Sequence, residues 1–284
     1  MKKVAVVTDS NAGIRQKEAK ELGIFVLPMP FTIDDQTYYE DINLTHEEFF
    51  EKQLNGAEIF TSQPVVGNVK ELWDQILKDY DEIVHIPMSS GLSGSCQTAM
   101  MLAQEYDNRV FVVDSQRISV TQKYDVIDAK RLADQGKSGQ EICDILTENK
   151  LNASIYITVN TLDYLKKGGR ITPAALLGGM LKIKPILQIQ GEKLDSFAKT
   201  RTMARGTKIM KEAIAKDIKE RFDDDYHNVH ICVAYTYDEA PALELKKELE
   251  ELYPGENIIC DPLSLSVSCH IGPHSLAIAI CKKI

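Results

Sequence analysis

The sequence lacks the patterns that are typical of secreted and membrane proteins. Its six cysteines are scattered and include no C-x-x-C pair, as expected for reduced and mostly buried thiols. No segment approaches the roughly 18 consecutive apolar residues that a membrane helix needs. The N-terminal apolar run Val4–Val7 is too short for the core of a signal peptide, and it predicts a first β-strand instead. We therefore expect a soluble, cytoplasmic protein.

Positive charge is also scarce. The chain has 33 Lys and Arg residues against 42 Asp and Glu, which gives a formal net charge of −9. A general nucleic-acid binder needs a basic face, so we expect no nucleic-acid partner. The remaining composition, 44% hydrophobic and 26% charged, is ordinary for a globular protein. The length suits two medium-sized domains.

Common catalytic and nucleotide-binding motifs are missing as well. The loop Gly91–Ser95 has a serine where the final glycine of the hydrolase motif G-x-S-x-G would stand. The sequence contains no G-x-x-x-x-G-K-[ST], and no G-x-G-x-x-G follows a predicted strand. A P-loop and a dinucleotide site are therefore not supported.

Metal binding receives little support from the acidic residues and histidines. Asp9, Asp41 and Asp114 could hold a metal, but acidic residues after strands more often cap helices or form turns. His270 and His274 are four residues apart, and the Gly and Pro between them exclude a regular helical H-x-x-x-H zinc pair. We expect no metal and no other cofactor.

Apolar runs and helical periodicities alternate along the first half of the chain, which predicts right-handed βαβ units. Ile83–Ile86 and Val110–Val113 are continuous apolar strands of the kind that a parallel sheet buries on both faces. Residues 1–150 are predicted to form a three-layer α/β domain with a parallel sheet and helices on both faces. Thr45 with Glu48, and Ser138 with Glu141, are predicted capping boxes.

The second half predicts a different α/β domain, residues 151–284, with a mixed sheet. Pro185–Ile189 and Leu194–Ala198 resemble the two strands of a hairpin. Amphipathic helices are expected over Met203–Phe222 and Glu239–Leu252, and a last strand over Ser275–Ile280.

Serine- and threonine-rich segments follow three predicted strands and precede one predicted helix. They are Thr8–Ser10, Thr61–Pro64, Ser89–Gly94 and Asp114–Ser115. If the strands are parallel, these loops share one edge of the sheet, where free backbone N–H groups and helix dipoles favour an anion. Hydroxyl groups can donate to such an anion without adding charge. The alternative is that these residues only cap helices and form turns.

Several features of the second half leave two interpretations open. Lys166–Arg170 fits a helix C-terminus with a glycine cap, yet Arg170 lies beyond that cap. Arg201 and Arg205 flank a predicted helix start, where the dipole repels cations unless an anion or acidic partner is near. His270 is predicted at a loop–strand junction, where it is either structural or faces a cleft. Pro173–Leu181 is either a closely packed buried helix or a space for an apolar ligand.

Taken together, these motifs resemble those of the DegV family, and the resemblance covers essentially the whole chain. The matching segments are TDS (Thr8–Ser10), TSQP (Thr61–Pro64), SSGLSG (Ser89–Gly94), VVDS (Val112–Ser115), GGRI (Gly168–Ile171) and H-x-GP (His270–Pro273). The resemblance implies two α/β domains with a long-chain fatty acid between them. It also implies a lipid-binding protein that is not itself an enzyme, in which the second domain closes an acyl tunnel.

In the bacterial fatty acid kinase system, such proteins present the carboxylate of the fatty acid to a separate kinase. The resemblance implies that the acyl-phosphate product stays bound and passes to phospholipid synthesis. The implied partners are a long-chain fatty acid and the fatty acid kinase catalytic subunit, with transient contact to a membrane surface. The implied fatty-acid-binding residues are Thr61, Ser62, Ser93, Gly94 and His270, and Arg170 and Arg201 are implied near the phosphoryl group or the kinase.

The sequence departs from the family pattern at Ile271, His274 and Cys96, where Thr, Gly and Tyr are usual. The hydroxyl-bearing loops are intact, so the departures concern the walls of the tunnel and the choice of acyl chain. The alternative function is a phosphate- or phosphosugar-binding enzyme that uses the same anion site. Its acid or base would be His270 or Asp9.

Overall fold

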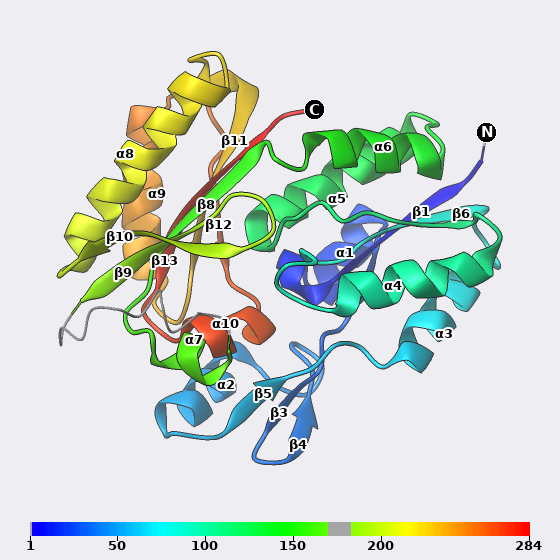
Figure 1. Ribbon diagram of the computed structural model, residues 1–284, viewed down its shortest axis with the longest axis horizontal. Coiled ribbons are helices and arrows are strands. Elements are labelled where there is room, and N and C mark those ends of the chain that lie inside the picture. The colour runs from blue at the N-terminus through cyan, green and yellow to red at the C-terminus, as the bar shows by residue number, and fades with distance from the viewer. Residues whose placement is uncertain (1, 170–182) are drawn as a thin grey trace. The chain divides into compact units, whose positions relative to one another are not determined.

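The computed structural model describes residues 2–169 and 183–284 (Figure 1). The chain divides into two compact units, Met1–Leu151 and Asn152–Ile284. No helix within the described ranges is long and apolar enough to cross a membrane.

The first unit is built around a four-stranded sheet in which every pairing is parallel. Its order is β2-β1-β6-β7, with bounds Phe25–Leu27, Val4–Asp9, Glu82–Ile86 and Val110–Val112. All residues of β1 and β6 are buried, because helices cover both faces of the sheet. This confirms the predicted α/β class and the parallel sheet.

Two helix layers enclose this sheet (Figure 1). On one face, α3 (Val66–Ile76) and α4 (Ser95–Ala103) form an apolar cluster with β1 and β6, in which Trp73 is fully buried. On the other face, α5 (Ser119–Asp134) packs on β1 and α6 (Gly139–Asn149) packs on β6 and β7. The short helix α1 (Gln16–Leu22) lies between β1 and β2 in the chain.

A second, three-stranded sheet in the first unit was not predicted. It is antiparallel, with order β4-β3-β5, and its strands are Gln36–Tyr38, Phe31–Ile33 and Ile59–Thr61. The β3–β4 turn places both Asp34 and Asp35 at positive φ, as a type I′ hairpin turn requires. Helix α2 (His46–Leu54) follows, and the ring of Phe49 packs edge-on against Phe31.

The predicted capping boxes are both present. Thr45 accepts a hydrogen bond from the Glu48 backbone N–H and begins α2, and Ser138 does the same with Glu141 at the start of α6. Each glutamate side chain reaches back to the backbone of its cap residue, so two N–H groups that the helix leaves unpaired are satisfied.

The second unit contains a mixed sheet, as predicted, and this sheet has six strands among the described residues. Its order is β10-β9-β8-β13-β11-β12, with bounds Leu194–Thr200, Lys184–Ile189, Ala153–Thr158, Leu276–Lys282, Val229–Tyr235 and Ile259–Pro262. Strands β9 and β10 form the predicted antiparallel hairpin, and only β11 and β12 pair in parallel. Helices α8 (Met203–Arg221) and α9 (Ala240–Leu252) pack on this sheet through one apolar cluster. Two short helices complete the unit, α7 (Asp163–Lys167) and α10 (Leu265–Ile271).

Candidate functional site

The carboxyl ends of β1 and β6 are joined by a buried polar network. The Thr8 hydroxyl donates to the carbonyl oxygen of Ile86 at 2.8 Å. From the α5 side, the Gln122 amide donates to the Thr8 hydroxyl and to the same Ile86 carbonyl, both at 3.1 Å. These contacts fix the spacing of the loops that follow the two strands.

Asp9 at the end of β1 belongs to the same network. Its carboxylate accepts hydrogen bonds from the backbone N–H of Met88 at 2.9 Å and of Asn11 at 3.0 Å. Burial raises the pKa of this carboxyl above its usual value, and the hydrogen bonds from Met88 and Asn11 oppose that shift. Asp9 thus ties the end of β1 to the loop after β6, which is a structural role.

The other two candidate metal ligands also have structural partners. Asp114 accepts a hydrogen bond from the Ser90 backbone N–H at 3.1 Å, and Asp41 forms an ion pair with Arg15 at 3.3 Å. Residues 2–169 and 183–284 contain no cluster of three or more His, Cys, Asp or Glu residues that could hold a metal ion.

The loop Ser89–Gly94 leads from β6 into α4. Its backbone turns back on itself, because the N–H groups of Leu92 and Ser93 both donate to the Ser89 carbonyl. The Ser93 hydroxyl oxygen accepts from the Ser95 N–H at 3.2 Å, and its own O–H can still donate to a ligand. The first N–H groups of α4 have no partner within the helix, so they add a partial positive charge beside Ser93.

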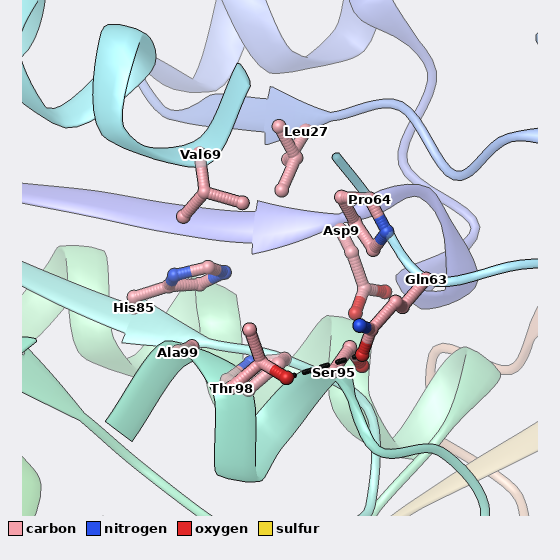
Figure 2. Close-up of a pocket in the computed structure, with 10 residues that line it drawn as sticks. Asp9, Leu27, Gln63, Pro64, Val69, His85, Ser95, Thr98 and Ala99 are labelled. Carbon is pink, nitrogen blue, oxygen red and sulfur yellow. Dashed lines mark hydrogen bonds between the residues drawn. The ribbon is translucent and has the colours of Figure 1, made fainter. Parts of the chain in front are cut away.

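The structure brings the loop Thr61–Pro64 against this second loop. The Thr98 hydroxyl on α4 donates to the Gln63 side-chain oxygen at 3.1 Å (Figure 2). The same oxygen lies 3.6 Å from where a Cβ on Gly94 would stand. Thr61 is half-buried at the end of β5, and Ser62 is exposed. Pro64 precedes the first turn of α3, because Val65 is the N-cap residue.

A small pocket with a cavity volume of about 10 Å³, room for about one water molecule, lies between the loop Thr61–Pro64, the start of α4 and the sheet face that α3 and α4 cover. Figure 2 shows Gln63, Thr98 and Asp9 toward one end of it and Val69 and His85 toward the other. The pocket is lined by Asp9, Leu27, Gln63, Pro64, Val69, His85, Pro87, Ser95, Thr98 and Ala99. Its polar lining comes from Asp9, Gln63, Ser95 and Thr98, and the predicted carboxylate-binding residues Thr61, Ser62, Ser93 and Gly94 are not among the residues that line it.

The second unit holds His270, which the sequence predicted at a loop–strand junction. It lies instead in the last turn of α10, half-buried. Its ring stands against Gly168 at the end of α7, where an added Cβ would come 2.0 Å from the His270 Nδ1. The glycine cap predicted after Lys167 is present, and the absence of a side chain there makes room for the imidazole.

Two of the three arginines that were predicted near an anion or an acidic partner lie in the described part of the chain. Arg201 is exposed between β10 and Thr202, the N-cap residue of α8, and Arg205 is exposed in the first turn of α8. Arg170 and Pro173–Leu181 lie outside the described residues.

Thr61, Ser62, Ser93 and Gly94 thus belong to the first unit, and His270 and Arg201 belong to the second. Sequence reasoning missed the contribution of Gln63 and Thr98, which join the loop Thr61–Pro64 to α4, and of the buried His85. The sequence signal that could have identified His85 is a histidine inside an otherwise mostly apolar strand, Glu82–Ile86.

Comparison with known proteins matches the DegV family, described as uncharacterised, over residues 3–283. A DegV domain-containing protein of Staphylococcus aureus is 30% identical over 284 residues and covers 100% of both chains. Protein DegV of Bacillus subtilis is 31% identical over 287 residues, with 99% of each chain covered.

Two solved structures are similar over 100% of both chains. One, described as fatty acid binding of a DegV family protein from Thermus thermophilus, has a TM-score of 0.89 at 27% identity. The other, DegV of Bacillus subtilis, is described as a fatty acid binding protein and has a TM-score of 0.88 at 28% identity. With a family match along almost its full length, the chain belongs to the DegV family.

Proposed function

We propose that this protein is a cytoplasmic carrier of a long-chain fatty acid and presents its carboxylate to a separate kinase. The observation that carries the proposal is the meeting of two hydroxyl-bearing loops, where the Gln63 side chain lies against Gly94 and accepts a hydrogen bond from Thr98 at the start of α4. Similar proteins that are described as binding fatty acids support the same ligand class.

The head group would be held by neutral donors. We assign the carboxylate to the hydroxyls of Thr61 and Ser93, with Ser62, the Gly94 backbone and the start of α4 beside them. A hydrogen bond to a charged group contributes about 1.5–3 kcal/mol. Neutral donors neutralise a carboxylate less than an arginine does, so its oxygen stays nucleophilic toward a phosphoryl donor.

The acyl chain would supply most of the affinity. Each buried methylene contributes roughly 0.8 kcal/mol, so a dozen contribute on the order of 10 kcal/mol before the cost of ordering the chain. The small pocket beside the loops would have to open to admit such a chain, and its apolar wall of Leu27, Val69 and Ala99 suits a hydrocarbon and not a phosphosugar. The sequence-based roles of His270 near the carboxylate, and of Arg170 and Arg201 near the phosphoryl group or the kinase, stay predictions.

Mass spectrometry of the organic extract from protein purified from bacteria tests ligand binding directly. We expect a fatty acid at close to one equivalent per chain, and thermal stabilisation by added fatty acid but not by phosphosugars. A protein that contains no fatty acid, binds none on titration and is stabilised by phosphosugars would instead be the phosphosugar-binding enzyme.

The substitution Ser93→Ala tests presentation. Removing one hydrogen bond to a carboxylate should weaken fatty-acid binding by about tenfold. Phosphorylation of the bound acid should fall further, by about a hundredfold, because the reacting oxygen loses its orientation. The measurement is acyl-phosphate formation by a bacterial fatty acid kinase catalytic subunit with ATP, at saturating fatty acid.

The matched control is Ser196→Ala, which removes an exposed hydroxyl on β10 and should leave both quantities unchanged. Equal phosphorylation rates for Ser93→Ala and the unmodified protein would contradict the presenting role even if the fatty acid binds.

A further inference from the structure

A short segment of the first unit, residues 113–118, connects β7 to α5 and anchors the loop Ser89–Gly94. The Ser89 N–H donates to the carbonyl oxygen of Arg117 at 2.9 Å. The Ser89 carbonyl in turn accepts a hydrogen bond from the Ser93 N–H at 3.2 Å. The position of Ser93, to which we assign the carboxylate, therefore depends on where this segment holds Ser89.

A second contact between the segment and the loop acts in the same direction. The Ser90 N–H donates to the Asp114 carboxylate at 3.1 Å. Two successive N–H groups at the start of the loop thus bond to residues 113–118, so the loop can keep its place only while the segment keeps its conformation.

The backbone around this segment is strained. Gln116 has φ 55°, and Ser119, the first residue of α5, also has φ 55°. This left-handed conformation costs energy in residues other than glycine, and it persists only where the surrounding structure holds it. Some group near these two residues must therefore fix the segment.

The Arg117 side chain can supply that constraint, because it stands between the two strained residues in the chain and is 2% exposed. Its Nη1 lies 2.6 Å from Oδ1 of Asp125 on α5 in a buried ion pair, and its Nη2 donates to the Asn149 carbonyl at 2.8 Å. Asn149 is the last residue of α6, where a helix leaves carbonyl groups unpaired. Arg117 thus ties residues 113–118 to both α5 and α6, which pack against each other (Figure 1).

The energetics of the ion pair favour a role in positioning. Asp125 is fully buried, and burial raises its pKa to about 6 even though the neighbouring Arg117 charge lowers it. Replacing a buried ion pair with apolar side chains of similar volume is often neutral or stabilising, so stability alone does not account for the pair. A buried pair can instead select one conformation of the chain around it.

We propose that Arg117 is a positioning residue, whose ion pair with Asp125 holds residues 113–118 in the conformation that aims the Ser93 hydroxyl at the carboxylate of the fatty acid. Arg117 acts through Ser89 and does not touch the ligand. This inference rests on the proposed function, because it takes the loop of Ser93 as the carboxylate site. Loss of the ion pair should impair presentation more than binding, since the acyl chain supplies most of the affinity.

The experiment removes both members of the ion pair together, in the double variant Arg117→Met/Asp125→Leu. No charge is left unpaired in the core, so the variant should unfold at a urea concentration close to that of the wild-type protein. We expect the dissociation constant for the fatty acid to rise by no more than about threefold. Acyl-phosphate formation by the kinase subunit, at saturating fatty acid, should fall by at least about tenfold, because the reacting oxygen loses its orientation.

The matched control is Lys130→Gln/Asp134→Asn, which removes a solvent-accessible ion pair at the other end of α5 and should change neither quantity. If the double variant at Arg117 and Asp125 binds fatty acid and is phosphorylated at the wild-type rate, the inference is wrong and the proposed function stands. If the wild-type protein itself binds no fatty acid, the proposed function fails.

Hydrogen exchange in the unmodified protein gives a second measurement, which does not depend on whether the double variant folds. The Ser89 N–H should exchange with solvent as slowly as the N–H groups of β6, because its acceptor is fixed in the core. In the folded double variant its exchange should be at least about tenfold faster. Exchange of Ser89 in the unmodified protein about a hundredfold faster than that of β6 would show that the segment does not hold the loop, and would overturn the inference.

Discussion

Replacing Gly272 with alanine is expected to lower the free energy of unfolding of the second unit by about 3 kcal/mol or more. Gly272 has φ 79° and ψ 173°, a backbone conformation that is essentially restricted to glycine. An added Cβ would also lie 2.2 Å from the Tyr164 ring on α7. Backbone strain and steric overlap therefore act together at one position.

Urea unfolding of Gly272→Ala measures this effect. Gly255→Ala is the matched control, because Gly255 has a similar φ of +88° but nothing lies within 4 Å of an added Cβ. In Gly255→Ala, backbone strain alone should lower the free energy of unfolding, by about 1–2 kcal/mol. Similar losses for both variants would show that the contact between Gly272 and Tyr164 is looser than the structure indicates.

Lowering the pH is expected to destabilise the first unit through His85. Burial holds the pKa of His85 at about 3, whereas an unfolded histidine has its ordinary value of 6.5. Between these values the unfolded chain binds the proton and the folded chain does not, so stability is lost as the pH falls. The loss from this residue is about 2.5 kcal/mol between about pH 7.5 and about pH 4.5.

The measurement is the difference in unfolding free energy between the wild-type protein and His85→Phe at several pH values. Taking the difference removes the other titrating groups. Burial raises the pKa of both Asp9 and Asp125, and these carboxyls add stability as the pH falls, opposite in sign to His85. A pH-independent difference would mean that the imidazole accepts a proton inside the fold at little cost.

The parallel sheet could be predicted because its strands are mostly apolar runs that end in polar loops. The two central strands, Val4–Asp9 and Glu82–Ile86, are buried along their whole length and are mostly apolar in sequence. The three-stranded sheet escaped prediction because each of its strands has three residues that mix polar and apolar side chains, so none shows an apolar run or a period of two. His270 was misplaced because the serine-rich segment before it has little helical pattern, and tertiary contacts decide the conformation there.

The positions of the site loops could be predicted only where the strands before them could be predicted. A shared edge for the loops after β1 and β6 follows from parallel pairing, which the apolar runs implied, whereas Thr61–Pro64 follows β5 of the antiparallel sheet. The Gln63–Thr98 hydrogen bond depends on how far α4 reaches over the loop after β5, and no local pattern encodes that distance. His85 was hidden because its strand predicts uniform burial, and only the register with Val7 and Val112 shows which face it occupies.

Gln122 bridges the ends of β1 and β6 from within the core, so the two strand ends are held together before any ligand arrives. Such preorganisation would reduce the entropy that the first unit loses on binding the proposed fatty acid. It would also limit how far the loops after these two strands can adapt to a different head group.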